Sequence, residues 1–147
     1  MVEKVICRLP DEIIYQTGCE VGPDQVLALY NDCGWTLYTN NPDRLISALH
    51  KSTQVITAWQ DDRLVGLVRA VGDGETILYI QDLLVLNSHR RRGIGSALLE
   101  KLCSLYPHVR QKVLMTDAKL EIRQFYAACG FEAGTDKGLA LFVKLDK

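Results

Sequence analysis

The chain has 147 residues, of which 48% are hydrophobic and 24% are charged, a composition that is ordinary for a globular protein. Its 17 basic and 18 acidic residues leave a formal charge of -1, so the chain as a whole attracts neither nucleic acid nor an anionic membrane. The length predicts one domain that spans residues 1–147.

The five cysteines lie at wide, unequal intervals and form no CxxC pair, which argues against a structural zinc site or a disulfide framework. An odd number of cysteines fits a reducing compartment, and we expect a soluble, cytoplasmic protein. No apolar run reaches the ~20 residues that span a bilayer, and the first residues are too charged for a signal peptide.

The N-terminal part begins with a short apolar segment, residues 4–8, which predicts a first strand. Apolar residues at helical spacing then predict a helix over residues 21–29, and Gly34 is a suitable stop. Asn41 stands before a proline, which is typical of a helix N-cap, and it predicts a second helix over residues 43–52.

Three strand-like segments follow, over residues 53–59, 64–71 and 76–86. Aspartates and glycines between them predict tight turns, at residues 61–62 and 72–74. The third segment is apolar almost throughout, so we expect it in the interior of the sheet with both faces covered.

The C-terminal part alternates helices and strands. A helix is predicted over residues 93–105, and a short strand follows at residues 113–115. The apolar face of that helix consists of Ile94, Leu98, Leu102 and Leu105. A second helix over residues 118–129 ends at Gly130, a typical C-terminal cap. Phe131 and residues 139–145 predict two antiparallel closing strands, and the order of elements predicts an α/β sandwich with a mixed sheet.

The segment from Asp82 to Ser96 is the most informative part of the sequence. An apolar strand runs into a basic turn, and the turn opens an amphipathic helix. Backbone N–H groups at a helix start carry the positive end of its dipole, and Gly93 and Gly95 let a phosphate approach them closely. Arginines at residues 90–92 add cationic donors. The combination indicates a site for a pyrophosphate or similar dianion. A helix start that only bonds solvent or a surface carboxylate is the structural alternative.

Two common phosphate-binding patterns do not fit this turn. No Gly-Lys-Ser/Thr follows it, as a P-loop requires, and Leu98 stands where the third glycine of GxGxxG belongs. The pattern Arg90-x-x-Gly93-x-Gly95 is similar to the Q/R-x-x-G-x-G/A motif of the GNAT superfamily of acyl-CoA-dependent N-acyltransferases. The preceding strand and the following apolar helix stand in the order of that family.

This resemblance implies a GNAT-like α/β fold with a mixed, mostly antiparallel sheet, a splayed central strand and flanking helices. It also implies an N-acetyltransferase that uses acetyl-CoA as co-substrate and no metal. In the family, pantetheine amides pair with main-chain groups at the end of the splayed strand, and the pyrophosphate binds the glycine turn. The residues that match these positions are Leu83, Leu84, Val85, Arg90, Arg91, Arg92, Gly93, Ile94, Gly95 and Ser96.

A second motif lies near the C-terminus, where residues 125–131 read FYAACGF and are similar to a box near the end of GNAT domains. In the family the tyrosine hydroxyl lies near the CoA sulfur and protonates the leaving thiolate, which implies that role for Tyr126. The alternative is that Tyr126 only packs on the apolar face of its helix. Many members of the family have asparagine and alanine where this chain has Lys119 and Ile122. The sequence therefore does not support a contact between a side-chain amide of this helix and pantetheine.

Asp82 is an acid within an apolar strand, where an unpaired charge is costly. Buried carboxyl groups can serve as bases, and an amine acceptor must lose a proton before it attacks. A catalytic base and a structural aspartate paired with an arginine such as Arg69 are both consistent with the sequence. GNAT enzymes also deprotonate through water chains, so the base is Asp82 or water.

The segment from Gly34 to Trp59, together with residues 80–82, resembles small bacterial GNAT proteins and the plant plastid type that acetylates arylalkylamines such as serotonin. This implies a small primary amine as acceptor. Trp35, Tyr38 and Tyr79 are candidates for a wall of the acceptor site, although aromatic residues also serve plain packing.

Other functions stay open at this point. A protein lysine or N-terminus competes with a small amine as acceptor, and a non-catalytic acyl-CoA-binding regulatory module would keep the same fold. His89 is expected to be a solvated surface histidine. The basic cluster at residues 89–92 is too small for a nucleic-acid surface, so we expect neither nucleic acid nor a membrane as partner. The choice between a monomer and a homodimer is open.

Overall fold

The computed structural model of the chain describes residues 12–146, and the strand predicted over residues 4–8 lies outside them. The chain divides into two compact units, one ending at Leu114 and the other beginning at Met115. The single domain therefore stays a prediction. Within the described residues, no helix is long and apolar enough to cross a membrane.

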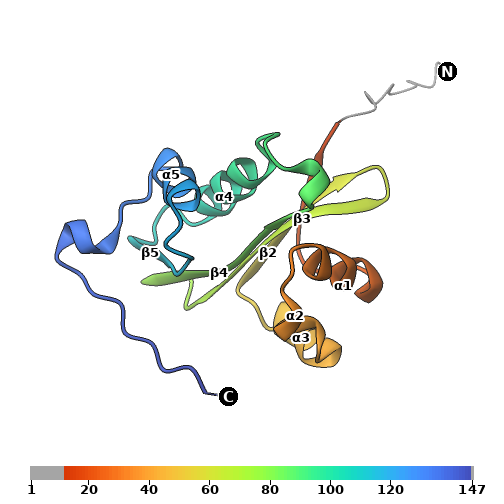
Figure 1. The fold of residues 1–147 in the computed structure, drawn as a ribbon, viewed down its shortest axis with the longest axis horizontal. Helices are drawn as coiled ribbons and strands as arrows, with labels where there is room; N and C mark the ends of the chain where they lie inside the picture. The colour runs from red at the N-terminus through yellow and green to blue at the C-terminus, as the bar shows by residue number, and fades with distance from the viewer. Residues whose placement is uncertain (1–11, 147) are drawn as a thin grey trace. The chain divides into compact units, whose positions relative to one another are not determined.

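In the first unit, five strands form one sheet in the order β1-β2-β3-β4-β5 (Figure 1). Their bounds are β1 Ile14–Thr17, β2 Gln54–Gln60, β3 Arg63–Gly72, β4 Ile77–Val85 and β5 Gln111–Leu114. Neighbouring strands from β1 to β4 pair antiparallel, and β4 and β5 pair parallel. The predicted mixed, mostly antiparallel sheet is confirmed. Strand β1 was not predicted, because its four residues, IYQT, alternate too briefly to give a period.

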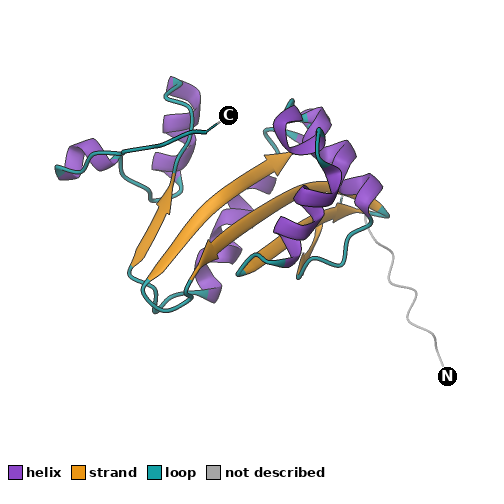
Figure 2. Ribbon diagram, turned by 90° about the horizontal axis from the view of Figure 1, so that it is seen from below, coloured by secondary structure: helices purple, strands orange, loops and turns teal. Residues whose placement is uncertain are grey.

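Helices cover both faces of this sheet (Figure 2). The helices of the first unit are α1 Pro23–Asp32, α2 Thr36–Thr39, α3 Pro42–His50 and α4 Ile94–Leu105, with a 3-10 turn η1 at Asn87–His89. The predicted cap of α3 is confirmed, since the side-chain oxygen of Asn41 accepts a hydrogen bond from the Arg44 N–H at 3.2 Å. Helix α4 joins the parallel strands β4 and β5 as a crossover, and it packs on β2, β3 and β4, whereas α1 packs on β3 and β4.

Helix α4 lies unusually close to the sheet at Gly66 of β3. A Cβ atom at this glycine would lie 3.1 Å from Leu98 Cδ1 and from the Leu84 carbonyl oxygen, and 3.2 Å from Ile94 Cγ2. These distances are tighter than an ordinary Cβ contact, so a side chain at this position would force its neighbours to shift by a few tenths of an ångström. The close contact fixes the first turn of α4 against the middle of the sheet.

The apolar face of α4 is narrower than predicted. Ile94, Leu98 and Leu102 are buried, and Leu99 adds to them, but Leu105 is 46% exposed. Leu105 is the last residue of the helix. Helical spacing predicts the direction of a side chain, but not where the covering layer ends.

Strand β4 carries one extra residue, Gln81, in its pairing with β3. Arg69 lies opposite Asp82, while the next residue, Ala70, lies opposite Ile80. Residues directly opposite each other share a face, and neighbours along a strand alternate, so Ile80 and Asp82 point to opposite faces of the sheet. This β-bulge reverses the alternation half-way along β4.

In the second unit, helix α5 spans Leu120–Ala128, and a 3-10 turn η2 spans Gly134–Lys137. The predicted end of the helix is confirmed, because Gly130 has the left-handed φ of 90°. The N–H of Gly130 donates to the Ala127 carbonyl at 3.1 Å, and that of Phe131 donates to the Tyr126 carbonyl at 3.0 Å. These two bonds form a Schellman motif.

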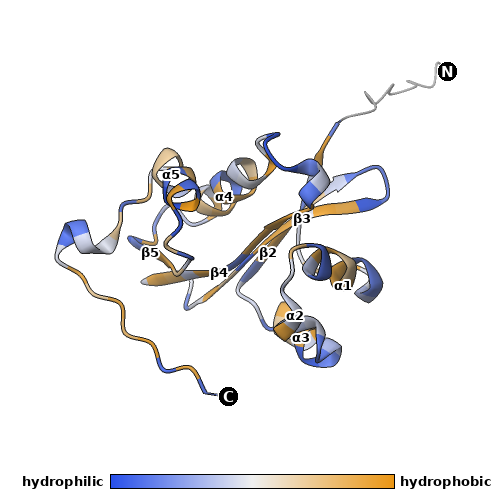
Figure 3. Ribbon diagram, in the orientation of Figure 1, coloured by the Kyte–Doolittle hydropathy of each residue, from blue (hydrophilic) through white to orange (hydrophobic). Residues whose placement is uncertain are grey.

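The two predicted closing strands are wrong, because neither Phe131 nor residues 139–145 form a strand in the described chain. The segment is extended and mostly hydrophobic (Figure 3). Its exposed large apolar residues are Leu139, Leu141, Phe142, Val143 and Leu145. The alternating pattern favours an extended backbone, but a strand also needs a neighbour for its hydrogen bonds. Among residues 12–146 the backbone of residues 140–146 finds no such ladder.

Candidate active site

The turn between β4 and α4 has the backbone shape of an anion site. Arg91 and Gly93 both have left-handed φ values, 64° and 79°. The first hydrogen bond inside α4 runs from the Ala97 N–H to the Gly93 carbonyl at 3.0 Å. The N–H groups of Ile94 and Gly95 precede this bond, so they point out of the helix start, as in other phosphate sites.

The three arginines of this turn, residues 90–92, have exposed side chains. The ion pairs among residues 12–146 are Arg69–Asp82 and Lys137–Glu132, so the turn's guanidinium groups are not committed to a carboxylate there. Positive side chains around a helix N-terminus suit a phosphate or pyrophosphate. In the same part of the chain, no group of three or more His, Cys, Asp or Glu side chains is placed to hold a metal ion.

The end of α1 holds the backbone that leads into this turn. Asp32 Oδ2 accepts a hydrogen bond from the Asn87 N–H at 2.7 Å, and the Asn87 side chain donates to the Asp32 carbonyl at 2.7 Å. One residue further, the Cys33 thiol donates to the Val85 carbonyl at 3.5 Å. Burial raises the pKa of this thiol, so Cys33 stays protonated near neutral pH. These contacts fix the end of β4 and the first residues of the segment that leads to the glycine turn.

Strand β4 continues beyond its parallel neighbour. Strand β5 pairs with residues 77–80 of β4 and ends at Leu114. Strand β4 runs on to Val85, and residues 82–85 pair with β3. In the described sheet, the other edge of residues 81–85 therefore has no neighbouring strand. The predicted splayed strand is confirmed, and its open edge includes the backbone of Leu83, Leu84 and Val85.

Asp82 is 1% exposed and lies at the centre of a hydrogen-bond network. Its Oδ2 accepts from Arg69 Nε at 2.7 Å and from the Tyr30 hydroxyl at 2.8 Å. Its Oδ1 accepts from the Tyr38 hydroxyl at 2.8 Å, and Tyr38 in turn accepts from Gln81 Nε2 at 2.9 Å. The ion pair with Arg69 that the sequence allowed is thus present. Burial, followed by the negative charge of Asp82, raises the pKa of both tyrosines, so both keep their hydroxyl protons.

The aromatic candidates for an acceptor wall lie on the same face of the sheet as Asp82. Trp35 stacks on Tyr38 with ring centroids 6.0 Å apart, and the buried Tyr30 meets both rings edge-on. Tyr79 lies opposite Val71, which shares its face of β3 with Arg69. Tyr38 belongs to the short helix α2, and Trp35 is the N-cap residue directly before it.

His89 corrects the prediction of a solvated surface histidine, because it is only 5% exposed. Its Nε2 lies 2.6 Å from Gln60 Oε1, and its Nδ1 lies 2.7 Å from the Ser88 hydroxyl. A neutral ring that donates through Nε2 and accepts through Nδ1 satisfies both contacts. Burial, followed by the charges of Arg92 and Arg63, lowers the pKa of His89. His89 therefore joins the basic turn to the β2–β3 hairpin.

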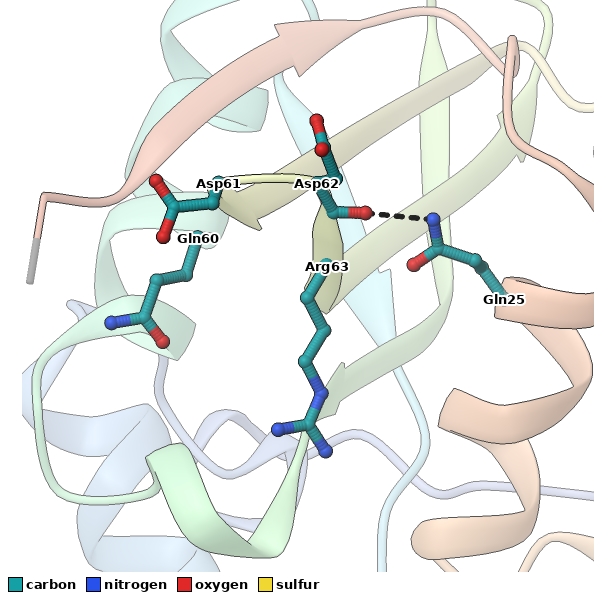
Figure 4. Close-up of a pocket in the computed structure, with 5 residues that line it drawn as sticks. All are labelled: Gln25, Gln60, Asp61, Asp62 and Arg63. Carbon is teal, nitrogen blue, oxygen red and sulfur yellow. Dashed lines mark hydrogen bonds between the residues drawn. The ribbon is translucent and has the colours of Figure 1, made fainter. Parts of the chain in front are cut away.

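A shallow depression lies at the β2–β3 turn (Figure 4). It includes Gln60, the residue that contacts His89 Nε2. It is lined by Gln25, Gln60, Asp61, Asp62 and Arg63. Gln25 bonds the backbone on both sides of the turn, as donor to the Asp62 carbonyl at 2.8 Å and acceptor from the Leu64 N–H at 2.7 Å. The depression thus belongs to the hairpin, and it contains none of the glycine-turn residues.

Tyr126 lies in the second unit, in the last turn of α5. Its ring meets Phe125 and Phe131 edge-on, with centroids 5.0 and 6.0 Å away. Burial raises the pKa of Tyr126 above its ordinary value, so the hydroxyl holds its proton near neutral pH. A phenol in that state is able to donate a proton.

Three residues of the site gave no signal in the sequence: Tyr30, Asp32 and Cys33. Their partners Asp82, Asn87 and Val85 follow 52 to 55 residues later. Local spacing carries no information about such contacts, which exist only because α1 packs on β3 and β4.

Residues 51–133, more than half of the chain, match the family described as an acetyltransferase (GNAT) domain. The chain belongs to the GNAT family. The matched region begins before β2 and extends beyond α5, so it includes strands β2 to β5, the glycine turn and the tyrosine box.

The chain is similar to a GNAT-family acetyltransferase of Streptococcus pneumoniae, with 31% identity and a TM-score of 0.83, over 92% of this chain and 99% of that one. It is 27% identical to the histone acetyltransferase TAP1 of Glycine max, over 84% of this chain and 57% of that protein. The chain thus spans little more than half of this plant relative. The aminoglycoside N-acetyltransferase AAC(6')-Iy in complex with CoA shares the fold, with 17% identity and a TM-score of 0.66, over 92% and 95% of the two chains.

The buried state of His89 predicts a pH-dependent stability. The pKa of His89 is lowered on folding. The neutral ring therefore contributes fully to the free energy of unfolding above the unfolded pKa of about 6.5, and this contribution is lost as the pH falls through the lower folded pKa. Urea unfolding between about pH 5 and about pH 7.5 should show stability rising with pH more steeply in the wild type than in His89→Gln. Equal slopes in wild type and His89→Gln would contradict the neutral buried histidine.

Proposed function

We propose that the chain transfers an acetyl group from acetyl-CoA to a small primary amine, by direct attack in a ternary complex. The observation that carries this proposal is the continuity of two features. The open edge of β4 at residues 81–85 leads directly into the turn at Arg91 and Gly93, where helix N–H groups and exposed arginines meet. A long cofactor with amides at one end and a pyrophosphate at the other fits that order.

The pantetheine arm of acetyl-CoA would lie along the open edge and pair with the main chain of Leu83, Leu84 and Val85. Its pyrophosphate would bind the N–H groups from Gly93 to Ser96, with the arginines of the turn around it. Bonds from the end of α1 to Val85 and Asn87 hold the end of the open edge and the backbone that follows it in place. A site that is rigid before binding loses less entropy when the cofactor is ordered.

In the reaction, the amine nitrogen bonds to the thioester carbonyl carbon and the carbonyl electrons move to oxygen. A backbone N–H of the open edge, such as that of Val85, would stabilise the oxyanion. The proton of the nitrogen leaves to Asp82 or to water. The oxyanion then collapses, the carbon–sulfur bond breaks, and Tyr126 donates its proton to the departing CoA thiolate. The products are the acetylated amine and CoA.

A small amine is favoured as the acceptor by the aromatic residues on the Asp82 face. Trp35 and Tyr38 offer stacked rings beside the network, and such rings bind amines and their cations. The fold is shared with an aminoglycoside N-acetyltransferase in complex with CoA. The second candidate acceptor is a protein lysine, which the similarity to a plant histone acetyltransferase favours.

Acetyl transfer itself is the direct test. The purified chain should transfer acetyl groups from acetyl-CoA to at least one amine among polyamines, arylalkylamines, amino acids and aminoglycosides, with products identified by mass spectrometry. A lysine peptide in the same screen distinguishes the second candidate. Binding of acetyl-CoA without transfer to any acceptor would favour a non-catalytic module, and absence of binding would contradict the proposal.

Replacement of Gly95 by aspartate should weaken acetyl-CoA binding by ~10²-fold or more, because it places a carboxylate where the pyrophosphate is expected. Titration calorimetry measures the affinity. Ser104→Asp is the matched control, since it adds the same charge to the exposed far end of α4, about 13 Å along the helix. Its affinity should stay within a few-fold of the wild type. If Gly95→Asp binds equally well, the anion site lies elsewhere.

Replacement of Tyr126 by phenylalanine should slow turnover by ~10²-fold or more, because the thiolate would leave without its proton donor. The affinity for acetyl-CoA should change by no more than a few-fold. Tyr15→Phe removes a half-buried hydroxyl from β1 and serves as the control with near wild-type turnover. Steady-state kinetics at saturating acetyl-CoA separates the two effects, and an unchanged kcat for Tyr126→Phe would remove Tyr126 from the mechanism.

A further inference from the structure

The carboxylate of Asp82 is too enclosed to meet a substrate. It is 1% exposed, and both oxygens are bonded, Oδ2 to Arg69 and Tyr30 and Oδ1 to Tyr38. An amine could contact it only by displacing one of these donors. If Asp82 receives a proton, that proton must therefore arrive through one of its three donors.

Only one of the three donors is suited to that task. Arg69 holds its proton too firmly to exchange it, and it is 7% exposed. Tyr30, a residue of α1, is fully buried. Tyr38 is half-buried on the short helix α2, so its ring connects the buried carboxylate with the surface of the site.

The hydroxyl of Tyr38 is bonded in the way that a proton relay requires. It donates to Asp82 Oδ1 at 2.8 Å and accepts from the side chain of Gln81 at 2.9 Å. A hydroxyl oxygen has two lone pairs, and Gln81 uses one of them. The remaining lone pair can accept a hydrogen from an N–H group. The bulge at Gln81 makes this arrangement possible, because it turns two consecutive side chains toward the same hydroxyl.

The relay also lies next to the expected reaction centre. Asp82 directly precedes Leu83, where the open edge of β4 continues toward Val85. Trp35 stacks on Tyr38 and would hold an amine near the hydroxyl through its ring face. An acceptor that lies against these two rings would approach a thioester on the open edge.

We propose that Tyr38 is a catalytic residue that takes the proton of the attacking nitrogen and passes its own proton to Asp82, with Arg69 and Tyr30 as positioning residues. This role rests on the proposed acetyl transfer. When the neutral amine bonds to the carbonyl carbon, its nitrogen becomes positive and one N–H bond breaks. That proton forms a new O–H bond on Tyr38, the former Tyr38 proton forms an O–H bond on Asp82 Oδ1, and Tyr38 remains a neutral hydroxyl throughout. After product release, Asp82 returns the proton to water by the same path.

The test compares two tyrosine-to-phenylalanine variants that each remove one hydrogen bond to Asp82. Tyr38→Phe should lower kcat/KM for the amine by ~10²-fold or more, while acetyl-CoA affinity stays within a few-fold. Tyr30→Phe removes the equivalent bond from the buried side and should lower kcat/KM less than tenfold. Thermal unfolding of both variants shows whether loss of stability explains either result.

The pH profile distinguishes a proton relay from a purely structural hydroxyl. The titratable groups that face Asp82 are Arg69, Tyr30 and Tyr38, and the two tyrosines have raised pKa values, so none of the three titrates between about pH 7 and about pH 9. In Tyr38→Phe, hydroxide must take the proton that the relay would take. The loss of kcat/KM relative to the wild type should therefore become smaller as the pH rises. In Tyr30→Phe the deficit should stay constant.

Two results would overturn this role. Equal effects of Tyr38→Phe and Tyr30→Phe, or a Tyr38→Phe deficit that does not change with pH, would mean that Tyr38 only supports the fold. Failure of the proposed function is seen separately, in the wild-type chain. If the wild type binds acetyl-CoA but acetylates no amine and no lysine peptide, the proposed function fails and the relay fails with it.

Discussion

A buried negative charge is the constraint around which the first unit is built. Asp82 lies inside the fold, and the cost of leaving such a charge unpaired is roughly 3–5 kcal/mol. Three side chains donate hydrogen bonds to this carboxylate from three directions: Arg69 on the neighbouring strand, Tyr30 on α1 and Tyr38 on α2. Because these donors must converge on one carboxylate, the helical layer is held in a fixed position over the sheet. The same requirement fixes the wall of the proposed acceptor site.

The opposite face of the sheet is organised by close packing rather than by charge. Gly66 lets α4 approach β3 closely, and the start of that helix is where the anion turn lies. Contacts from Asp32 and Cys33 at the end of α1 then reach the strand end and the turn. The cofactor site of the proposed enzyme is thus supported from both faces of the sheet, although most of its own contacts would be made by main-chain groups.

The parts of the structure that the sequence predicts well are those decided by local chemistry. Asn41 caps α3 and Gly130 ends α5, as expected from the conformations that these residues favour. The mixed sheet followed from the order of elements along the chain, and the splayed strand followed from the resemblance of the glycine turn. Prediction failed where distant residues decide the outcome. His89 stands beside three arginines and reads as a surface residue, yet Gln60, 29 residues away, accepts its proton in the interior. The C-terminal segment has the pattern of a strand but no neighbour among the described strands.

The bulge in β4 fixes the number of residues that this strand can have. One residue, Gln81, reverses which side chains face each helical layer, so Asp82 meets α1 and α2 while Leu83 points the other way. Loss of a single residue between Ile80 and Val85 would exchange the two faces of the strand end, and gain of one would do the same. A change in length that preserves both faces is therefore expected only in loops outside this stretch. If an alignment with a relative opens a gap of one residue between Ile80 and Val85, it equates side chains that face opposite sides of the sheet.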